Sequence, residues 1–377
     1  MSSVVIFGLG PAGLFLARQL AKKDVQIFGI GRKDDIGLYS KYVNAYVAET
    51  KEEIISAIKN IKIEYDEKLI GYVCSDQYLT MLLNDCPEVF EIINFIGVKK
   101  EYYELINNKQ KLTEFCIDLG FKLPKTYNFK ELINKENVDF PIALKLNTKE
   151  INTKKNPIGK IKIIRNKKEL NSLDDEISKF KINETEIIVQ EYIEGDNNLQ
   201  FSFGGYFFNG IEKAGIVVNQ VGQYPQGISS LVLEIDDGEI NRNIKELVLR
   251  FAESLKYTGF LEMEFKTRQN VIYLMDINPR TWGWVSILGK KYPEFHNILC
   301  EDNGITINKI SELVMWKSPM RNYIGNLRNP LNVKKLKDRL NNYKKSNVAY
   351  DLYDPNDLKP VFATLKVIGV KLKKKLR

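Results

Sequence analysis

The first thirty residues constrain the fold of this chain more than any other segment. A short apolar run, Val4–Phe7, leads into the glycine-rich turn Gly8–Gly13, and apolar residues at helical spacing then precede a second apolar run, Val25–Ile30. A strand, a glycine turn, a helix and a strand in this order form a βαβ unit. We therefore expect an α/β chain that opens with a parallel sheet.

The turn itself, GLGPAG, matches the pattern G-x-G-x-x-G. Such a loop lets backbone N–H groups at a helix N-terminus approach an anion. A dinucleotide site also requires an acidic residue at the end of the second strand, but here the strand runs into Arg32 and no acid occurs before Asp34. Arg32 is suited to a 2′-phosphate, so an NADP-dependent oxidoreductase stays open as an alternative. In the other interpretation the glycines serve close strand–helix packing or bind a substrate anion.

Length and composition narrow the class of protein. With 377 residues the chain is too long for one simple core, and we expect two or three lobes. Its hydrophobic content of 44% and charged content of 28% are typical of a soluble globular protein. We expect neither a transmembrane span nor a secretory signal, because no apolar run is long enough and the N-terminus lacks a basic region. The four cysteines lack metal-binding spacing, which excludes a zinc site and favours reduced thiols in a cytoplasm.

Charge and histidine content exclude further classes. The net charge is +8, five positive charges lie in the last seven residues, KLKKKLR, and no nucleic-acid motif occurs, so we expect no nucleic-acid partner. His296 is the single histidine, which argues against a Ser–His or Cys–His nucleophile. Lysines, carboxylates and a metal must therefore carry any chemistry.

The remaining chain alternates helices and strands. We expect α/β material to about residue 100, a helical segment closed by Gly120, and lower periodicity after about residue 300. The other expected elements are strands in PIALKLN, GKIKIIRN and TEIIVQEYI, helices over Lys168–Phe180 and Glu239–Leu255, and strands over Gln200–Gly215, Gly227–Glu234 and Gly259–Asn278.

The sequence GFLEMEFKTRQNVIYLMDINPR predicts a β-hairpin with one acidic face. Apolar residues alternate with Glu262 and Glu264 in the first strand. A three-residue loop beginning at Arg268 pairs Glu264 with Leu274 and Glu262 with Asp276. The acids would then share one face, on which like charges oppose each other across the strands and destabilise the pair.

A cation would relieve this repulsion. Glu264 and Asp276 supply two carboxylates and Asn278 an amide oxygen, and these hard ligands suit Mg²⁺ that also coordinates phosphate. The alternative is a solvated polar face of an edge hairpin.

Two lysines also indicate a phosphate-binding site. Lys145 lies within an apolar strand and Lys109 opens a helix, and half-buried ammonium groups need partners such as phosphates. The strand end VQEYIEGDN could expose backbone groups to an adenine edge.

Taken in order, these motifs resemble the ATP-grasp superfamily over roughly residues 1–300. The order is the glycine-turn domain, Asn108-Lys109 with Gly120 beyond it, then PIALKLN, VQEYIEGD, EMEF and DINPR. The chain looks most similar to the carbamoyl-phosphate-synthase-like and D-aspartate-ligase-like branch of carboxylate–amine ligases. This resemblance implies an α/β ATP-grasp fold with a Rossmann-like N-terminal domain and two lobes that clamp ATP. The implied units are a Rossmann-like domain over 1–100, a helical segment and small lobe over 101–196, a metal-binding large lobe over 197–300, and a C-terminal extension over 301–377.

The resemblance also implies a role for each candidate residue. The implied nucleotide-binding residues are Lys109, Lys145, Lys160, Gln190, Glu191, Ile193, Asp196 and Asn197. Of these, the lysines would contact the phosphates, Gln190 the adenine amino group, the backbone of the next residues the adenine edge, and Asp196 or Asn197 the ribose. Glu264, Asp276 and Asn278 would hold one or two Mg²⁺ ions, with Mn²⁺ as an alternative. Arg280 would face the transferred phosphate and the acyl group, and it is a catalytic candidate together with Lys145.

Three departures from the family pattern leave a second alternative, a catalytically degenerate nucleotide-binding protein. The phosphate-covering loop, KEINTKKNPIGKI, contains Gly159 as its only glycine, and Lys154, Lys155 or Lys160 would compensate for the missing glycines. Asp276 stands where the family more often has glutamate. Gln220 and Gly222 stand where relatives often carry a basic residue.

We expect the activity of the family, amide or peptide bond formation from a small carboxylate and an amine through an acyl phosphate. The family context suggests a cell-surface polysaccharide or cell-wall precursor as the acceptor. The C-terminal tail places Val361, Leu365, Ile368 and Leu372 on one helical face among lysines, which is typical of a helix on an anionic membrane surface. The alternative is a helix packed on the body. We expect a cytoplasmic protein, peripheral to the membrane if the tail binds it, with a homodimer as one option for its oligomeric state.

Overall fold

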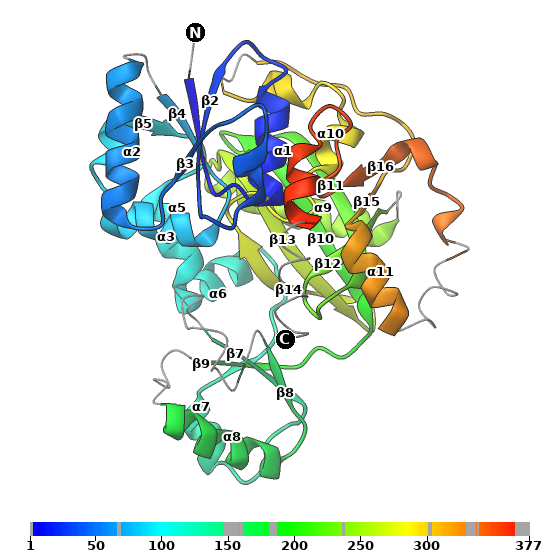
Figure 1. The fold of residues 1–377 in the computed structure, drawn as a ribbon. Coiled ribbons are helices and arrows are strands. Elements are labelled where there is room, and N and C mark those ends of the chain that lie inside the picture. The colour runs from blue at the N-terminus through cyan, green and yellow to red at the C-terminus, as the bar shows by residue number, and fades with distance from the viewer. Residues whose placement is uncertain are drawn as a thin grey trace, which may run out of the picture.

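The computed structural model describes residues 3–65, 69–146, 158, 161–180, 187–235, 238–300, 304–328, 337 and 339–365. In this part of the chain the strands form three sheets, of five, seven and four strands. The four-stranded sheet and its helices lie apart from the other two, at the bottom of Figure 1. No helix among these residues has the length and apolar content that crossing a bilayer requires.

The five-stranded sheet is parallel, as the βαβ opening predicts. Its strands are β1 (Ser3–Phe7), β2 (Gln26–Gly31), β3 (Asn44–Val47), β4 (Leu69–Val73) and β5 (Ile93–Phe95), in the order β3-β2-β1-β4-β5. Its helices are α1 (Pro11–Leu20), η1 (Ile36–Tyr39), α2 (Lys51–Glu64), α3 (Asp76–Asp85) and α4 (Val89–Ile92). A Cβ on Gly13 would overlap the carbonyl oxygen of Gly8. The glycine turn therefore serves the close approach of α1 to the end of β1.

Two helices, α5 (Lys100–Asn107) and α6 (Lys109–Asp118), follow where the sequence predicted a single helical segment. The break falls at Asn108, whose side chain accepts a hydrogen bond from the backbone N–H of Lys111 at 3.0 Å and caps α6. Gly120 adopts a φ of +86°, which few other residues tolerate, and closes the segment as predicted.

The seven-stranded sheet has the order β14-β13-β10-β11-β12-β15-β16. Its strands are β10 (Gln200–Phe208), β11 (Ile211–Gln223), β12 (Ser229–Glu234), β13 (Gly259–Arg268), β14 (Val271–Asn278), β15 (Met315–Lys317) and β16 (Val348–Tyr350). The helices between them are η3 (Asn197–Leu199), α9 (Glu239–Ser254), α10 (Ile287–Lys291), η4 (Phe295–Ile298), α11 (Pro319–Arg328) and η5 (Lys345–Asn347). The C-terminal extension thus contributes β15 and β16 to the same sheet as the hairpin of β13 and β14.

One predicted strand is wrong. Gln200–Gly215, expected as a single strand, is divided by a tight turn at Asn209 and Gly210, both with positive φ. The two halves pair as the antiparallel strands β10 and β11. An Asn-Gly pair between apolar runs is a strong signal for a two-residue hairpin turn, and the sequence contained it.

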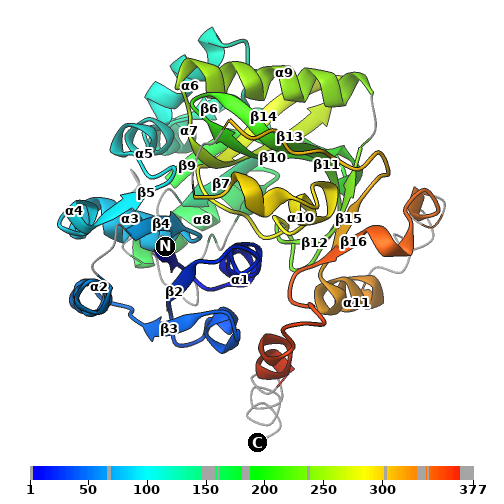
Figure 2. The same ribbon diagram turned by 90° about the horizontal axis from the view of Figure 1, so that it is seen from above.

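The two large sheets share one hydrophobic core. In Figure 2, α9 covers one face of the seven-stranded sheet, while α10 and α1 lie beyond the other. The core on the α1 side joins Phe15 and Ile6 of the first domain to Phe260, Trp282 and Trp284 of the large lobe. The first domain is therefore packed against the large lobe through apolar side chains.

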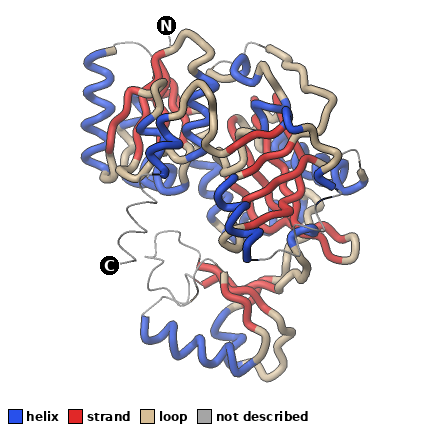
Figure 3. Tube along the Cα trace, turned by 45° about the vertical axis from the view of Figure 1, so that its right-hand side comes forward, coloured by secondary structure: helices blue, strands red, loops and turns tan. Residues whose placement is uncertain are grey.

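The small lobe has a core of its own. It contains β6 (Thr126–Tyr127), β7 (Ile142–Leu146), β8 (Lys162–Ile164) and β9 (Ile187–Glu191), in the order β6-β9-β7-β8, with α7 (Phe129–Asn134) and α8 (Lys167–Phe180). Its buried cluster includes Leu144, Leu170 and Val189 and no described residue of the other sheets. Figure 3 shows this lobe joined to the body through loops near β9. By contrast, α5 and α6 contribute Tyr102 and Cys116 to the core under α9.

Candidate active site

The hairpin β13–β14 carries the predicted acidic face, but in a different register. The turn has two residues, Gln269 and Asn270, with φ of +50° and +65°, instead of the predicted three. Glu264 therefore pairs with Asp276 and not with Leu274, and Glu262 pairs with Asn278 and not with Asp276. A bulge at Met275 restores the alternation, since directly paired residues share a face. All four polar residues still lie on one face.

Electrostatics on this face are dominated by negative charge. Burial raises the pKa of Glu262 well above its ordinary value, and the nearby charges of Glu264 and Asp276 raise it further. The Nδ2 of Asn278 donates to Glu262 Oε2 at 3.1 Å. Glu264 is half-buried and Asp276 is exposed. The pair opposed across the hairpin can therefore present carboxylate oxygens to a cation from the solvent side.

No cluster of three or more histidine, cysteine, aspartate or glutamate residues with metal-site geometry occurs in the described part of the chain. The predicted set consists instead of two opposed carboxylates and the amide of Asn278. This set fits Mg²⁺, which is commonly held by one or two carboxylates with water and substrate phosphates completing its shell.

Arg280 follows β14 directly and is held from three sides. Its Nε and Nη2 donate to the two carboxylate oxygens of Asp76 at 2.8 and 2.6 Å. Nη2 also donates to Asn278 Oδ1 at 3.2 Å, and Nη1 donates to the carbonyl of Thr281 at 2.6 Å. Asp76 is the first residue of α3, so this bidentate ion pair joins the first domain to the residues that follow β14.

Asp76 is the site residue that sequence reasoning missed. It lies 204 positions from Arg280, and only the packing of the first domain on the large lobe brings the two together. Its signal was weak, since Ser75 and Asp76 read simply as a helix start. Cys74 lies close by, but burial raises the pKa of its thiol to about 12, so it is protonated at neutral pH and is no nucleophile.

The predicted hinge contains β9 and the residues after it. Gln190 is buried and pairs with Thr126 and Ala143 on the neighbouring strands. Ile193 is buried, and Asp196 is exposed and accepts from the backbone N–H of Asn198 at 2.9 Å. Asn197 begins η3, and nothing is described of its side chain.

Two contacts that sequence reasoning missed tie this hinge to β13. Arg268 Nη1 forms an ion pair with Glu191 Oε1 at 2.7 Å. Partial burial alone would raise the pKa of Glu191, but the bonds from Arg268 and from the backbone N–H of Lys125 bring it below its ordinary value. The ammonium of Lys266 lies over the ring of Tyr192, 5.1 Å from its centroid. Both cations continue the every-second-residue series of Glu262 and Glu264 along β13, so the sequence predicted the face on which they lie but not their partners.

The predicted phosphate-binding lysines are described only in part. Lys145 is half-buried on β7 opposite Ile188, and no described residue forms a hydrogen bond or ion pair with its ammonium. Lys109 is the first residue of α6, and its side chain is outside the description. Lys160 and most of the phosphate-covering loop lie outside the described residues.

Gln220, where relatives often carry a cation, has a structural role here. Its Nε2 donates to Ser202 Oγ at 2.6 Å, and its Oε1 accepts from Ser229 Oγ at 2.8 Å. The buried amide thus connects the three neighbouring strands β10, β11 and β12. A cation at this position would break this arrangement.

The glycine turn gives little support to a dinucleotide site. Asp35 Oδ2 accepts from the backbone N–H groups of Leu9 and Arg32 at 2.9 and 3.0 Å. The Arg32 guanidinium donates to Gln77 Oε1 at 2.9 Å. A carboxylate of the chain itself therefore occupies a loop amide that an incoming phosphate would need.

Comparison with known proteins establishes the fold. No protein-family model matches the chain, and no curated protein matches its sequence. Solved structures do match. An N5-carboxyaminoimidazole ribonucleotide synthetase in its ADP complex aligns with a TM-score of 0.65 and 13% identity over 83% of this chain and 80% of its own. A biotin carboxylase from Campylobacter jejuni aligns at 0.62 and 15% over 83% and 74%. An L-amino acid ligase from Bacillus licheniformis aligns at 0.56 and 13% over 79% and 73%.

All three are ATP-grasp enzymes, and the chain has the ATP-grasp fold. This confirms the predicted α/β fold class and the ATP-grasp fold that the resemblance implied. At these sequence identities the likeness establishes the fold alone. The chemistry has to be argued from the residues of this chain.

Proposed function

We propose that the chain is an ATP- and Mg²⁺-dependent carboxylate–amine ligase that releases ADP. The observation that carries the proposal is the face on which Glu264 opposes Asp276, with Asn278 next along β14 and Arg280 two residues beyond it. In an ATP-grasp fold this face adjoins the place where two lobes meet. Structures with the same fold support the nucleotide, since they include complexes with ADP and with the magnesium salt of ADP.

The nucleotide would lie between the small and large lobes. Lys145, together with Lys109 and Lys160, would contact its phosphates, and Gln190 with the backbone of Glu191 and Ile193 would hold the adenine. Asp196 or Asn197 would contact the ribose. The half-buried ammonium of Lys145, which no described residue engages, supports the first of these roles.

Glu264, Asp276 and Asn278 would hold one or two Mg²⁺ ions, or Mn²⁺. When bound, the metal supplies charge neutralisation for the phosphates during transfer. A substrate carboxylate then attacks the γ-phosphate in line, forming an acyl phosphate and ADP. An amine attacks the acyl carbon, phosphate leaves, and a proton is lost from the new amide nitrogen.

Arg280 would stabilise the oxyanion that develops in the second step. Such a donor is typically worth ~10²–10³ in rate. Four of the five N–H bonds of its guanidinium are used by Asp76, Asn278 and Thr281. The remaining N–H on Nη1 has no described partner and is the one available to a substrate oxygen.

The acceptor belongs to the same proposal. We infer a cell-surface polysaccharide or cell-wall precursor that carries a carboxylate or an amine, handled in the cytoplasm by a monomer or homodimer. Contact of the basic C-terminus with the membrane would bring the enzyme to lipid-linked precursors. Residues 366–377 lie outside the described part of the chain.

An ADP-release screen of carboxylate and amine pairs with Mg²⁺ tests the reaction. We expect turnover for at least one pair, none for Asp276→Ala, and full turnover for Glu253→Ala, which removes another exposed acid of the large lobe. Turnover undiminished in Asp276→Ala would contradict the metal assignment. Amine-driven ADP release would exclude the degenerate alternative, and tight NADPH binding that survives Asp276→Ala would instead favour the oxidoreductase.

A further inference from the structure

The positive charge of the protein is concentrated at its C-terminal end. Residues 315–377 contain 16 lysines and arginines against 4 aspartates, whereas residues 1–314 contain 40 basic and 44 acidic residues. The net charge of +8 therefore arises from this final segment alone. A strongly basic segment of this kind is attracted to a polyanionic partner, whereas the rest of the chain, with a small excess of acidic residues, is not.

Within the same segment, α11 exposes a stripe of apolar side chains. Met320, Tyr323 and Leu327 are 44%, 66% and 65% exposed. Their spacing of three and four residues places them on one face of the helix. The helix contains Arg321 and Arg328 and no acidic residue. Arg328, at the end of the helix, is exposed and adds positive charge beside these apolar groups, whereas Arg321 is half-buried and donates to the carbonyl of Ser229 at 3.5 Å.

A second helical segment, residues 359–365, exposes another apolar face. Leu358, Phe362 and Leu365 are 38%, 63% and 58% exposed, again at spacings of four and three. This segment and α11 lie on the same side of the molecule, at the lower edge of Figure 2. We call these six residues the C-terminal apolar surface: Met320, Tyr323, Leu327, Leu358, Phe362 and Leu365.

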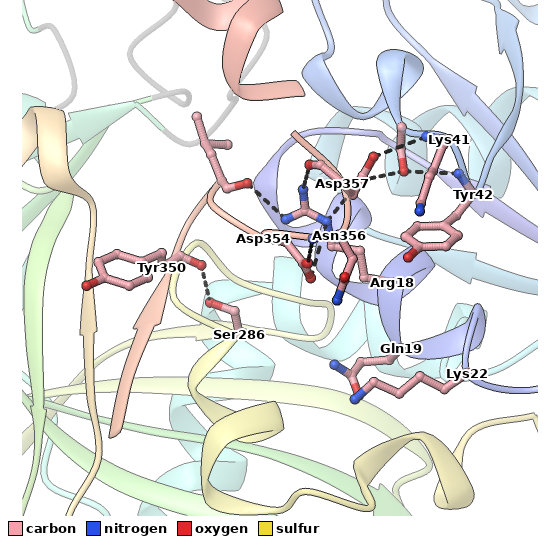
Figure 4. A network of polar contacts seen from close by, with 12 residues as sticks. Arg18, Gln19, Lys22, Lys41, Tyr42, Ser286, Tyr350, Asp354, Asn356 and Asp357 are labelled. Carbon is pink, nitrogen blue, oxygen red and sulfur yellow. Dashed lines mark hydrogen bonds and ion pairs between the residues drawn. The ribbon is translucent and has the colours of Figure 1, made fainter. Parts of the chain in front are cut away.

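A buried polar network fixes the start of the second segment (Figure 4). Arg18 Nε and Ser40 Oγ donate to Asp357 Oδ2 at 3.0 and 2.8 Å, and the backbone N–H of Lys41 donates to Asp357 Oδ1 at 3.2 Å. Arg18 Nη1 also donates to the carbonyl of Leu352 at 3.0 Å. The chain is therefore anchored to the first domain immediately before Leu358, and the apolar residues that follow leave the body at a defined point.

We propose that the C-terminal apolar surface, together with the basic residues of the segment 315–377, docks the protein on an anionic lipid bilayer. Lipid accounts for both features, because headgroups attract the lysines and arginines while the apolar side chains enter the headgroup boundary. A nucleic acid would use only the charges. A second copy would bring two strongly basic segments together, which like-charge repulsion opposes. The inference rests on, and deepens, the proposed membrane contact, by adding α11 and the exposed residues before 366.

Vesicle flotation of the full chain without nucleotide tests this separately from ligase activity. We expect binding to vesicles of phosphatidylcholine mixed with phosphatidylglycerol, little binding to phosphatidylcholine alone, and release at high salt. Changing Phe362→Ser with Leu365→Ser should weaken binding by about tenfold or more, and Tyr323→Ser with Leu327→Ser should act in the same direction. Changing Lys373, Lys374 and Lys375 together to glutamine should weaken it on the order of a hundredfold, since each basic residue contributes about fivefold.

The matched control is Ile63→Ser with Ile211→Ser, which removes two equally exposed apolar side chains on α2 and β11. It should bind vesicles like the wild type, and all variants should melt at the wild-type temperature because the changed side chains are exposed. Equal binding to both vesicle types, no binding, or equal loss in the control would overturn the proposal. So would a dimer of the wild type that the Phe362 and Leu365 changes dissociate.

Discussion

The ion pair between Asp76 and Arg280 predicts that a residue of the first domain controls the chemistry at the end of β14. The test is Asp76→Asn, which keeps the shape of the side chain and removes its charge. Arg280 would retain its bonds to Asn278 and Thr281 but lose the charge that orients its plane. A guanidinium that donates to both oxygens of one carboxylate is held in one orientation, whereas a guanidinium that donates only to neutral acceptors can adopt several.

The expected magnitudes follow from burial. The side chains of Arg280 and Asp76 are 16% and 29% exposed, so the pair is intermediate between a surface pair and a fully buried one. Breaking a fully buried pair costs about 3–5 kcal/mol and a surface pair about 0–1 kcal/mol. We therefore expect Asp76→Asn to cost about 1–2 kcal/mol, a decrease in Tm of roughly 1–3 °C for a chain of this length.

The pair between Arg18 and Asp357 provides a matched control. It also joins the first domain to a distant part of the chain through arginine and aspartate, and it is more deeply buried, at 9% and 0% exposed. Asp357→Asn should therefore lower Tm more than Asp76→Asn does. Because it lies away from the metal-site hairpin, it should leave turnover per folded molecule unchanged.

Thermal melting and steady-state ADP release measure the two effects. We expect Asp76→Asn to reduce kcat by about tenfold or more, with the KM for ATP nearly unchanged, since Arg280 acts on the acyl group. Asp76→Glu should restore part of the rate. The reasoning is refuted if Asp357→Asn lowers kcat as much as Asp76→Asn, because Asp76 would then serve only to dock the first domain.

Three further predictions concern single residues. Burial and the nearby Lys22 and Lys23 lower the pKa of His296 below 6.5. The folded state therefore binds the proton less tightly than the unfolded chain does, so the protein loses stability as the pH falls below about 6.5. The Tm of His296→Gln should consequently decrease less on acidification than the Tm of the wild type. Since it is the only histidine, one imidazole NMR titration checks the pKa directly, and a value above 6.5 would contradict the argument. Gly204→Ala should destabilise by about 1–3 kcal/mol, because its Cβ would overlap the Trp282 ring and lie 2.7 Å from Trp284; an unchanged Tm would contradict the packing. Lys145→Met should weaken ADP binding by roughly tenfold to a hundredfold through loss of a charged hydrogen bond, measured by calorimetry, while Lys130→Met should not.

Local patterns in the sequence predicted the elements on which the site is built. The alternation of β13 and β14 placed Glu264 and Asp276 on one face, because side chains alternate strictly along a strand. Their register was predicted wrongly because it depends on the turn, and Gln269 and Asn270 adopt the two positive φ values of a two-residue loop. The bulge at Met275 shifts the register by one residue close to the acids and offsets the difference in turn length. The predicted face was therefore correct although the predicted pairing was wrong.

Local sequence patterns could not predict the contacts between segments that are distant in the sequence. Nothing near Asp76 indicates that it meets Arg280, since the contact exists only after the first domain packs on the large lobe. The same holds for Arg268 and Glu191, which lie on different sheets. The C-terminal extension has weak periodicity because β15 and β16 are three residues each, too short for an alternating pattern to be visible.

These contacts show that the first domain is attached to the rest of the molecule more extensively than the small lobe is. The first domain is joined to the large lobe by a common hydrophobic core and by the pair of Asp76 with Arg280, and it is joined to the C-terminal extension by the pair of Arg18 with Asp357. The small lobe has a separate core, and its described ion pair to the large lobe is the one between Arg268 and Glu191. A unit attached by few contacts is the one free to move. Lys145 lies in that unit and the acids of β13 and β14 in the fixed one, so closure of the small lobe is the motion that would bring the proposed phosphate and metal ligands together.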